Sequence, residues 1–177
     1  MLLATYVATR PGIQGINNKL IRLRLGTDMT HNELVFEPCD GVDFLMPDKT
    51  TKVNDKNQLW SASSTIAEKL PEYCPNRPGG FGGVRFKRIN VYTDDWITIK
   101  LGFPREVRLE AAKWFKENQG AYYDYPLIAD YVFWALSKQQ VNAYICSEAI
   151  ATAIKMIEPH RYDPPTLHNT LQYISSI

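Results

Sequence analysis

The stretch His31-Asn32-Glu33-Leu34-Val35-Phe36-Glu37 alternates between two kinds of side chain and is followed by Pro38. A period of two is typical of a β-strand, because successive side chains point to opposite faces of the sheet. One face then carries His31, Glu33, Val35 and Glu37. The opposite face carries Leu34 and Phe36 with Asn32. The stretch therefore predicts a strand with one apolar face and a histidine on the more polar face, ending at the proline.

Other segments in the first half of the chain also predict strands. They are residues 2–9, 59–64, 84–91 and 96–101, which are rich in β-branched and aromatic residues. Residues 16–25 have near-helical spacing instead. The cluster Gly79-Gly80-Phe81-Gly82-Gly83 lacks the GK[ST] ending and the following helix of a phosphate-binding loop, so it predicts a tight hairpin or a close approach of two backbones.

The second half of the chain has a helical period. Helices are predicted in residues 104–120, 125–136 and 146–157, with a last short helix after Pro164-Pro165. The stripe of the third helix consists of Ala149, Ile150, Ala153, Ile154 and Ile157, and Pro159 is expected to stop it. The stripe of the last helix is Leu167, Leu171 and Ile174. Strands first and helices later predict an α+β fold, an antiparallel sheet with helices packed on one side.

Length and composition limit the classes of protein that fit. The chain has 177 residues, of which 45% are hydrophobic and 22% charged, and its formal net charge is +1. These values are typical of a single globular domain spanning residues 1–177. The balanced charge provides no overall field for a nucleic acid or an anionic membrane. The N-terminal apolar run is interrupted by Thr5 and followed by Arg10-Pro11, which predicts neither a signal peptide nor a membrane span, so we expect a cytoplasmic protein.

Cys146 is the first candidate for chemistry. It lies at the predicted start of an amphipathic helix, where unpaired N–H groups and the helix dipole favour an anion and lower the pKa of a thiol. The alternative is a buried core cysteine. Glu148, two residues further on, would oppose thiolate formation unless its side chain points away. With Cys39 and Cys74 the chain has an odd number of cysteines, which argues against a disulfide framework or a zinc site built on CxxC pairs.

A thiolate needs a base, and the chain offers three histidines. We expect His160 and His168, in the proline-flanked C-terminal region, to be solvated or to cap helices. His31 lies on the polar face of its strand, and Glu33 follows about 6.5 to 7 Å further along that face, close enough to orient the imidazole ring. The sequence therefore predicts His31 as the base, although a histidine at a strand end also fits a structural role.

Five segments, taken in order, resemble one family. They are Thr30-His31-Asn32-Glu33-Leu34-Val35-Phe36, Trp60-Ser61-Ala62-Ser63, Gly82-Gly83-Val84-Arg85-Phe86, Gly120-Ala121-Tyr122-Tyr123-Asp124 and Cys146-Ser147-Glu148. Their order, with the histidine before a cysteine that opens a helix, is similar to that of the circularly permuted papain-like amidases. These are the YiiX-like relatives of the NlpC cysteine peptidases, and the resemblance is strongest to versions carried by phages and prophages.

The resemblance implies a papain-like core in which the cysteine helix packs against an antiparallel sheet that carries the histidine. In such families a polar residue on the strand after the histidine orients the ring. By position this residue is Ser61 or Ser63, where relatives often have a histidine or a glutamate. Ser61 and Glu33 therefore compete for the role. Cross-strand spacing of about 4.5 to 5.5 Å slightly favours Ser61 over a residue two places along the same strand.

The chemistry that the resemblance implies is attack by Cys146 on an amide, ester or thioester carbonyl after His31 has taken its proton. The Cys146 backbone N–H would hold the oxyanion together with a second donor, for which Tyr123 and Tyr144 are the candidates. No metal or organic cofactor is needed. The substrate would be a peptide, a lipid or another acylated molecule, in the host cytoplasm if the protein is encoded by a phage.

One geometric expectation bears on the choice between the enzyme and its alternative. The imidazole nitrogen of His31 and the sulfur of Cys146 should lie about 3 to 4 Å apart. The alternative is a catalytically inactive phage protein of the same fold that acts in binding or assembly, since a fold does not imply an activity. The serine at the third position favours this alternative, and the intact cysteine and histidine favour the enzyme.

Overall fold

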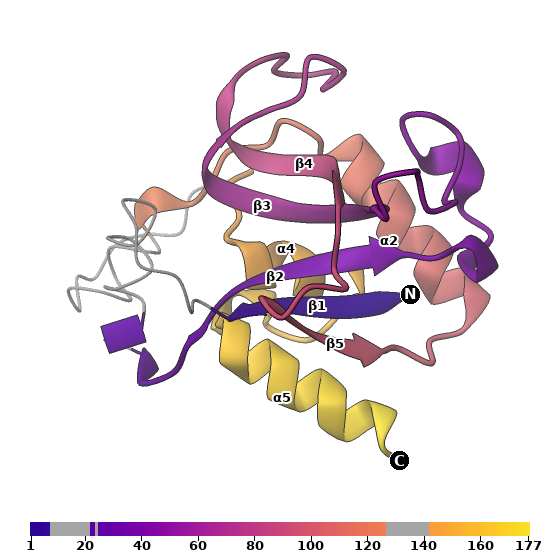
Figure 1. Ribbon diagram of the computed structural model, residues 1–177. Helices are drawn as coiled ribbons and strands as arrows, with labels where there is room; N and C mark the ends of the chain where they lie inside the picture. The colour runs from indigo at the N-terminus through magenta and orange to yellow at the C-terminus, as the bar shows by residue number, and fades with distance from the viewer. Residues whose placement is uncertain (8–21, 24, 127–141) are drawn as a thin grey trace.

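A computed structural model describes residues 1–7, 22–23, 25–126 and 142–177 of the chain (Figure 1). Its strands form one five-stranded sheet in the order β4-β3-β2-β1-β5, and every neighbouring pair is antiparallel. The strands are β1 (Leu2–Val7), β2 (Met29–Phe36), β3 (Leu59–Lys69), β4 (Phe81–Ile89) and β5 (Trp96–Lys100). All five predicted strands are thus present. The predictions for residues 8–9, for most of 16–25 and for 127–136 lie outside the described residues.

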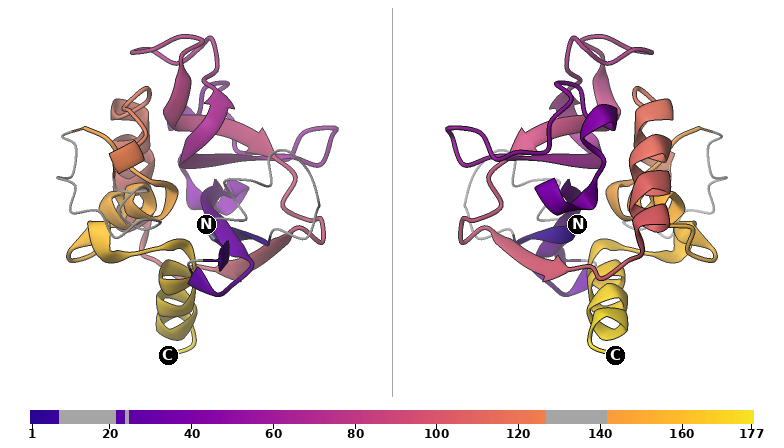
Figure 2. Two further views of the ribbon diagram at one scale, coloured as in Figure 1. Left: turned by 90° about the vertical axis from the view of Figure 1, so that its left-hand side faces the viewer. Right: turned by 90° about the vertical axis from the view of Figure 1, so that its right-hand side faces the viewer.

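The described α-helices pack on one face of this sheet, as Figure 2 shows. They are α2 (Arg105–Glu117), α4 (Cys146–Ala153) and α5 (Pro164–Ser175), and short 3-10 turns lie at Pro38–Asp40, Asp43–Leu45 and Pro159–Arg161. The main core lies between the two layers. The sheet contributes Leu3, Leu34, Phe36, Ala62, Val84 and Phe86, and the helices contribute Ala111, Ala112, Phe115, Ala149, Ile150, Leu167 and Leu171. The prediction of an α+β fold is confirmed.

Helix α4 packs against β2, the central strand of the sheet, and against its neighbour β3. Ala149, Ile150 and Ala153 are fully buried, as predicted. The helix ends earlier than Pro159 because Lys155 adopts a left-handed conformation with φ of 60°. The N–H of Met156 donates to the carbonyl of Ala151, the arrangement of a Schellman motif.

The predicted stripe of α4 was therefore too long. Ile157 lies beyond the helix and is 84% exposed. The stripe of α5 was also too long: Leu167 and Leu171 are buried, but Ile174 is half-exposed.

His168 differs from the prediction of a solvated or capping residue. It lies within α5, is buried, and its Nδ1 is 2.8 Å from the Thr5 hydroxyl of β1. Burial lowers the pKa of this histidine. The prediction was wrong because His168 lies beside Leu167 and Leu171 on the buried face of α5, which contacts β1 and β2.

The ladder between β2 and β3 is short, and this matters for the site. It joins Leu34, Val35 and Phe36 to Ala62, Ser61 and Trp60, whereas β1 pairs with β2 as far as Met29. The backbone of β2 before Leu34 therefore lies outside the β2–β3 ladder. The first turn of α4 reaches the sheet at this point.

The glycine cluster forms the end of a long β3–β4 hairpin and the start of β4. The Leu70 N–H donates to the Gly80 carbonyl, and Gly83 already lies within the strand. Beside Gly83, the segment with Gly120 and Ala121 runs along β4, because Val84 exchanges hydrogen bonds with both of these residues. The predicted close approach of two backbones is confirmed at this position.

None of the helices in the described ranges combines the length and hydropathy that crossing a bilayer requires.

We predict that Gly83→Ala destabilises the protein. A Cβ at this position would lie 2.1 Å from the Ala121 carbonyl oxygen, and φ is +126°, which an L-residue rarely adopts. The expected loss is at least about 2 kcal/mol in the free energy of unfolding, measured by chemical denaturation. Gly102→Ala is the matched control, because a Cβ there meets no atom within 4 Å. Equal stabilities of the two variants would contradict the prediction.

Candidate active site

The segment before α4 delivers Cys146 to the sheet. Asn142 has a left-handed backbone with φ of 58°. The chain then runs beside Tyr122, because Tyr122 and Ala143 form a parallel bridge, reinforced by hydrogen bonds from Tyr122 N–H to the Asn142 carbonyl and from Tyr144 N–H to the Tyr122 carbonyl. Ile145 keeps an extended conformation as the N-cap, and Cys146 is the first helical residue. The thiol therefore lies where the helix N–H groups are unpaired, as the sequence predicted.

The Cys146 sulfur has several polar partners although the residue is only 4% exposed. It is hydrogen-bonded to the side chain of His31, and it accepts the backbone N–H groups of Asn32 and Ser147. Burial alone would raise the pKa of the thiol. The charge and hydrogen bond of His31, together with the two N–H groups, outweigh burial and lower this pKa. The structure thus brings together the two residues that the sequence predicted as a pair.

Asn32 lies on β2 just before the ladder to β3 begins at Leu34, and its backbone and side chain have other partners. Its N–H donates to the sulfur, and its carbonyl accepts the Ser63 hydroxyl at 2.6 Å. Its side-chain amide donates to Thr5 at 2.8 Å on the neighbouring strand. Helix α4 and a β3 side chain therefore satisfy the backbone of β2 where its ladder to β3 has ended.

His31 lies between two partners. In addition to Cys146 it contacts Glu33, with 2.8 Å between Nε2 and Oε1, and its side chain is 25% exposed. Burial would lower the pKa of the imidazole. The charge and hydrogen bond of Cys146, and then those of Glu33, outweigh this effect and raise the pKa to about 10. The ring is therefore held by two partners and is still partly exposed to solvent.

Glu33 is itself fixed by an arginine. Arg85 on β4 donates to both carboxylate oxygens, with Nη1 2.8 Å from Oε2 and Nη2 2.6 Å from Oε1. Glu33 and Arg85 are 1% and 3% exposed. Burial would raise the pKa of the carboxyl, but the charge and hydrogen bonds of Arg85 and His31 lower it well below its ordinary range. Glu33 is therefore a carboxylate throughout the physiological range.

The slight preference for Ser61 as the orienting residue was wrong. Ser61 pairs with Val35, four residues along β2 from His31, and its hydroxyl donates to the Lys87 carbonyl at 3.0 Å. Ser63 donates to the Asn32 carbonyl, so neither serine is bonded to the ring. A cross-strand neighbour is close only to the residue opposite it, and the register does not place Ser61 opposite His31.

The two tyrosines proposed as oxyanion donors lie in different places. Tyr123 is buried, and its pKa is raised well above the ordinary value by burial and by the negative charge of Cys146. Tyr144 instead packs its ring edge-on against Trp114, with the centroids 5.1 Å apart. Tyr123 is therefore the better placed of the two.

The Glu148 carboxylate binds the backbone at the start of α4. It accepts the Ile145 N–H at 3.4 Å, which satisfies one of the unpaired donors of the first helical turn.

Three participants in the site were not predicted from the sequence. They are the side chain of Arg85 and the backbone N–H groups of Asn32 and Ser147. Alternation puts Arg85 on the same strand face as Lys87, so the sequence carries no local signal that this arginine is buried. Its partner Glu33 lies two strands away on β2, and this proximity follows only from the pairing of β4 with β3 and of β3 with β2.

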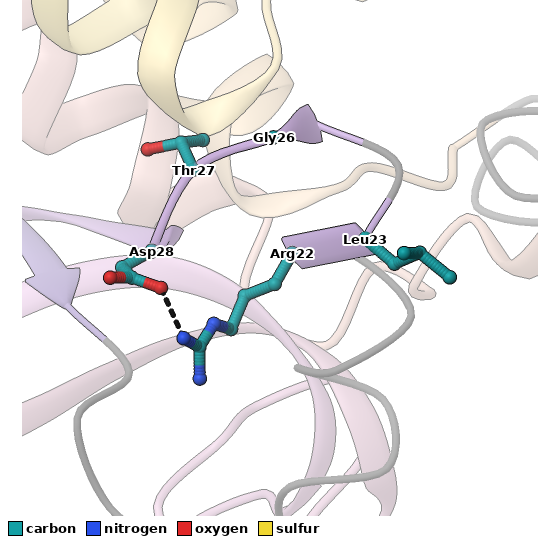
Figure 3. A pocket seen from close by; sticks show the side chains of 5 residues that line it. All are labelled: Arg22, Leu23, Gly26, Thr27 and Asp28. Carbon is teal, nitrogen blue, oxygen red and sulfur yellow. Dashed lines mark ion pairs between the residues drawn. The ribbon is translucent and has the colours of Figure 1, made fainter.

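Two other features could be taken for sites. Glu37, Cys39 and Asp40 have ligand atoms within 4.8 Å of one another, but the Met1 amino group pairs with both carboxylates and Lys100 pairs with Glu37. The charges there are balanced without an ion. A pocket before β2 is lined by Arg22, Leu23, Gly26, Thr27 and Asp28, with an ion pair between the arginine and the aspartate (Figure 3). It contains none of the residues that surround Cys146.

No family model, no curated protein and no solved structure matches this chain.

We predict that Glu33→Gln lowers the pKa of His31, because the ring loses a charged acceptor. The pKa of about 10 means that the imidazolium persists until the pH rises through that value, so the variant should lose it about one pH unit or more lower. A proton NMR titration of the His31 ring measures this. Ser61→Ala is the control and should leave the titration unchanged, since that hydroxyl bonds to a backbone carbonyl. A shift with Ser61→Ala and none with Glu33→Gln would refute the assignment.

Proposed function

We propose that the protein is a cysteine-dependent hydrolase or acyltransferase, a thiol peptidase or amidase in the broad sense, with a circularly permuted papain-like core. One observation carries the proposal: Cys146, at the N-terminus of a helix, is hydrogen-bonded to His31, and Glu33 contacts the other side of the same ring. Nucleophile, base and orienting residue in contact are the arrangement that thiol acyl transfer needs. The order of histidine strand and cysteine helix, and the resemblance described above, support the papain-like assignment.

The nucleophile would be the thiolate of a Cys146–His31 ion pair. The proton of the thiol resides on the imidazole, and the positive ring and two backbone N–H groups stabilise the negative sulfur. Glu33 holds Nε2, which leaves the other ring nitrogen for the sulfur and the substrate. Because this carboxylate is ionised, it also stabilises the imidazolium.

Acyl transfer would then follow in two steps. The sulfur attacks the carbonyl carbon and forms a carbon–sulfur bond. The tetrahedral intermediate collapses as the bond to the leaving group breaks, and His31 gives its proton to that group. His31 next takes a proton from water, or from an acceptor nucleophile, which attacks the thioester and releases the acyl product and the Cys146 thiolate.

Donors for the oxyanion are available near the sulfur. The backbone N–H of Cys146 belongs to the first turn of α4, where N–H groups have no partner within the helix. The second candidate is the Tyr123 hydroxyl, which burial and the charge of Cys146 keep protonated by raising its pKa. The proposed substrates are amides, esters or thioesters of a peptide, a lipid or another acylated molecule.

An inactive protein of the same fold, acting in binding or assembly, is the alternative. The serine at the expected third position was the feature that favoured it. Glu33 fills the position beside the ring, which removes this reason and favours the enzyme.

A panel of chromogenic substrates tests the proposal. We expect p-nitrophenyl esters, p-nitroanilides or aryl thioesters to release their leaving group with an acyl adduct on Cys146 detected by mass spectrometry. Cys146→Ala should remove the adduct and reduce turnover by at least about 1,000-fold. Cys39→Ala, which removes an exposed thiol, should retain activity. Neither adduct nor turnover with any member of the panel would favour the inactive alternative.

A further inference from the structure

The geometry points to Arg85 as a positioning residue that fixes Glu33 against His31, an inference that rests on the proposed function. The reacting groups would then belong to a buried row of alternating charges that runs from Arg85 through Glu33 and His31 to Cys146. Arg85 touches neither the thiol nor the imidazole in any contact found within the described residues. It would act through the carboxylate alone.

The first reason to assign this role to Arg85 is that it binds both carboxylate oxygens of Glu33. A guanidinium that donates to both oxygens fixes the plane of a carboxylate, whereas a single contact leaves it free to rotate. Oε1 of Glu33 accepts both Nη2 of Arg85 at 2.6 Å and Nε2 of His31 at 2.8 Å. The orientation that satisfies the arginine is therefore the one that presents Oε1 to the ring.

Burial is the second reason. A carboxylate that is 1% exposed takes up a proton unless a cation faces it, and a neutral carboxyl would hold the imidazolium much less strongly. Arg85 is the largest favourable influence on the charge of Glu33. Without it, we expect Glu33 to become protonated in the range where the Cys146–His31 ion pair has to exist.

Arg85 is in turn held in place from the outer end of the row. Its Nε donates to Glu68 at 3.1 Å, and Glu68 also pairs with the half-exposed Lys87. Each nitrogen of the guanidinium thus donates to a carboxylate, Nη1 and Nη2 to the buried Glu33 and Nε to the partly exposed Glu68. This fixed position is what a residue that orients another side chain requires.

A double-mutant cycle tests the inference. The measured quantity is the pH midpoint for alkylation of Cys146 by iodoacetamide, followed by peptide mass spectrometry. We expect Arg85→Met to raise this midpoint by about one pH unit, because the thiol loses part of the stabilisation that the imidazolium gives to its anion. In a Glu33→Gln background, where no carboxylate remains to be positioned, Arg85→Met should cause no further shift.

Lys87→Met is the matched control. It removes a cation two residues along the same strand that contacts Glu68 and not Glu33, so the midpoint should stay in place. If Arg85→Met does not fold, Arg85→Lys replaces it: the charge is kept but the two-point contact is lost, and the midpoint should shift in the same direction. Circular dichroism of each variant verifies folding.

The outcomes separate this inference from the proposed function. Equal shifts for Arg85→Met in both backgrounds, an unchanged midpoint or a downward shift would overturn the role of Arg85 while leaving the thiol chemistry intact. A wild-type midpoint at about pH 8.5, the ordinary value for cysteine, would overturn the proposed function and this inference together.

Discussion

The site depends on one constraint, which is that a charge removed from water must face an opposite charge. Burying an unpaired ion costs several kcal/mol, and a row of alternating charges in contact offsets much of that cost. With the proposed thiolate at Cys146, Arg85, Glu33, His31 and Cys146 would form such a row, and they come from β4, β2 and the start of α4. The relative positions of these three elements are therefore linked by electrostatics as well as by apolar packing.

The short ladder between β2 and β3 makes room for this arrangement. A continuous ladder would occupy the backbone of Asn32, whereas here its N–H is available to the sulfur and its carbonyl to Ser63. The apolar stripe of α4 holds the helix against both strands, so its N-terminus stays at the opening. Packing thus determines where the thiol lies, and the backbone N–H groups of Asn32 and Ser147 help to lower its pKa.

Much of this could be predicted from the sequence, because alternation and helical periodicity are local patterns. They gave the five strands, and they put His31 and Glu33 on one face and Cys146 at a helix start. Cross-strand partners depend on register, which a single sequence does not reveal. For this reason Ser61 was preferred over Glu33 and Arg85 received no role, although a histidine and a glutamate two places apart on one strand have side chains long enough to meet. The end of α4 was misjudged because a left-handed residue such as Lys155 carries no clear signal in the sequence. Ile174 does lie within α5, but it is half-exposed.

The proposed chemistry requires a thiolate at Cys146 that exists because of His31. The most direct measurement is the ultraviolet absorbance of the thiolate as a function of pH, taken as the difference between the wild type and Cys146→Ala. We expect the thiolate to be present well below about pH 8.5, the ordinary pKa of a cysteine, and to be lost from that lower range in His31→Gln. A thiolate that forms only near about pH 8.5, with the same titration in both proteins, would contradict it.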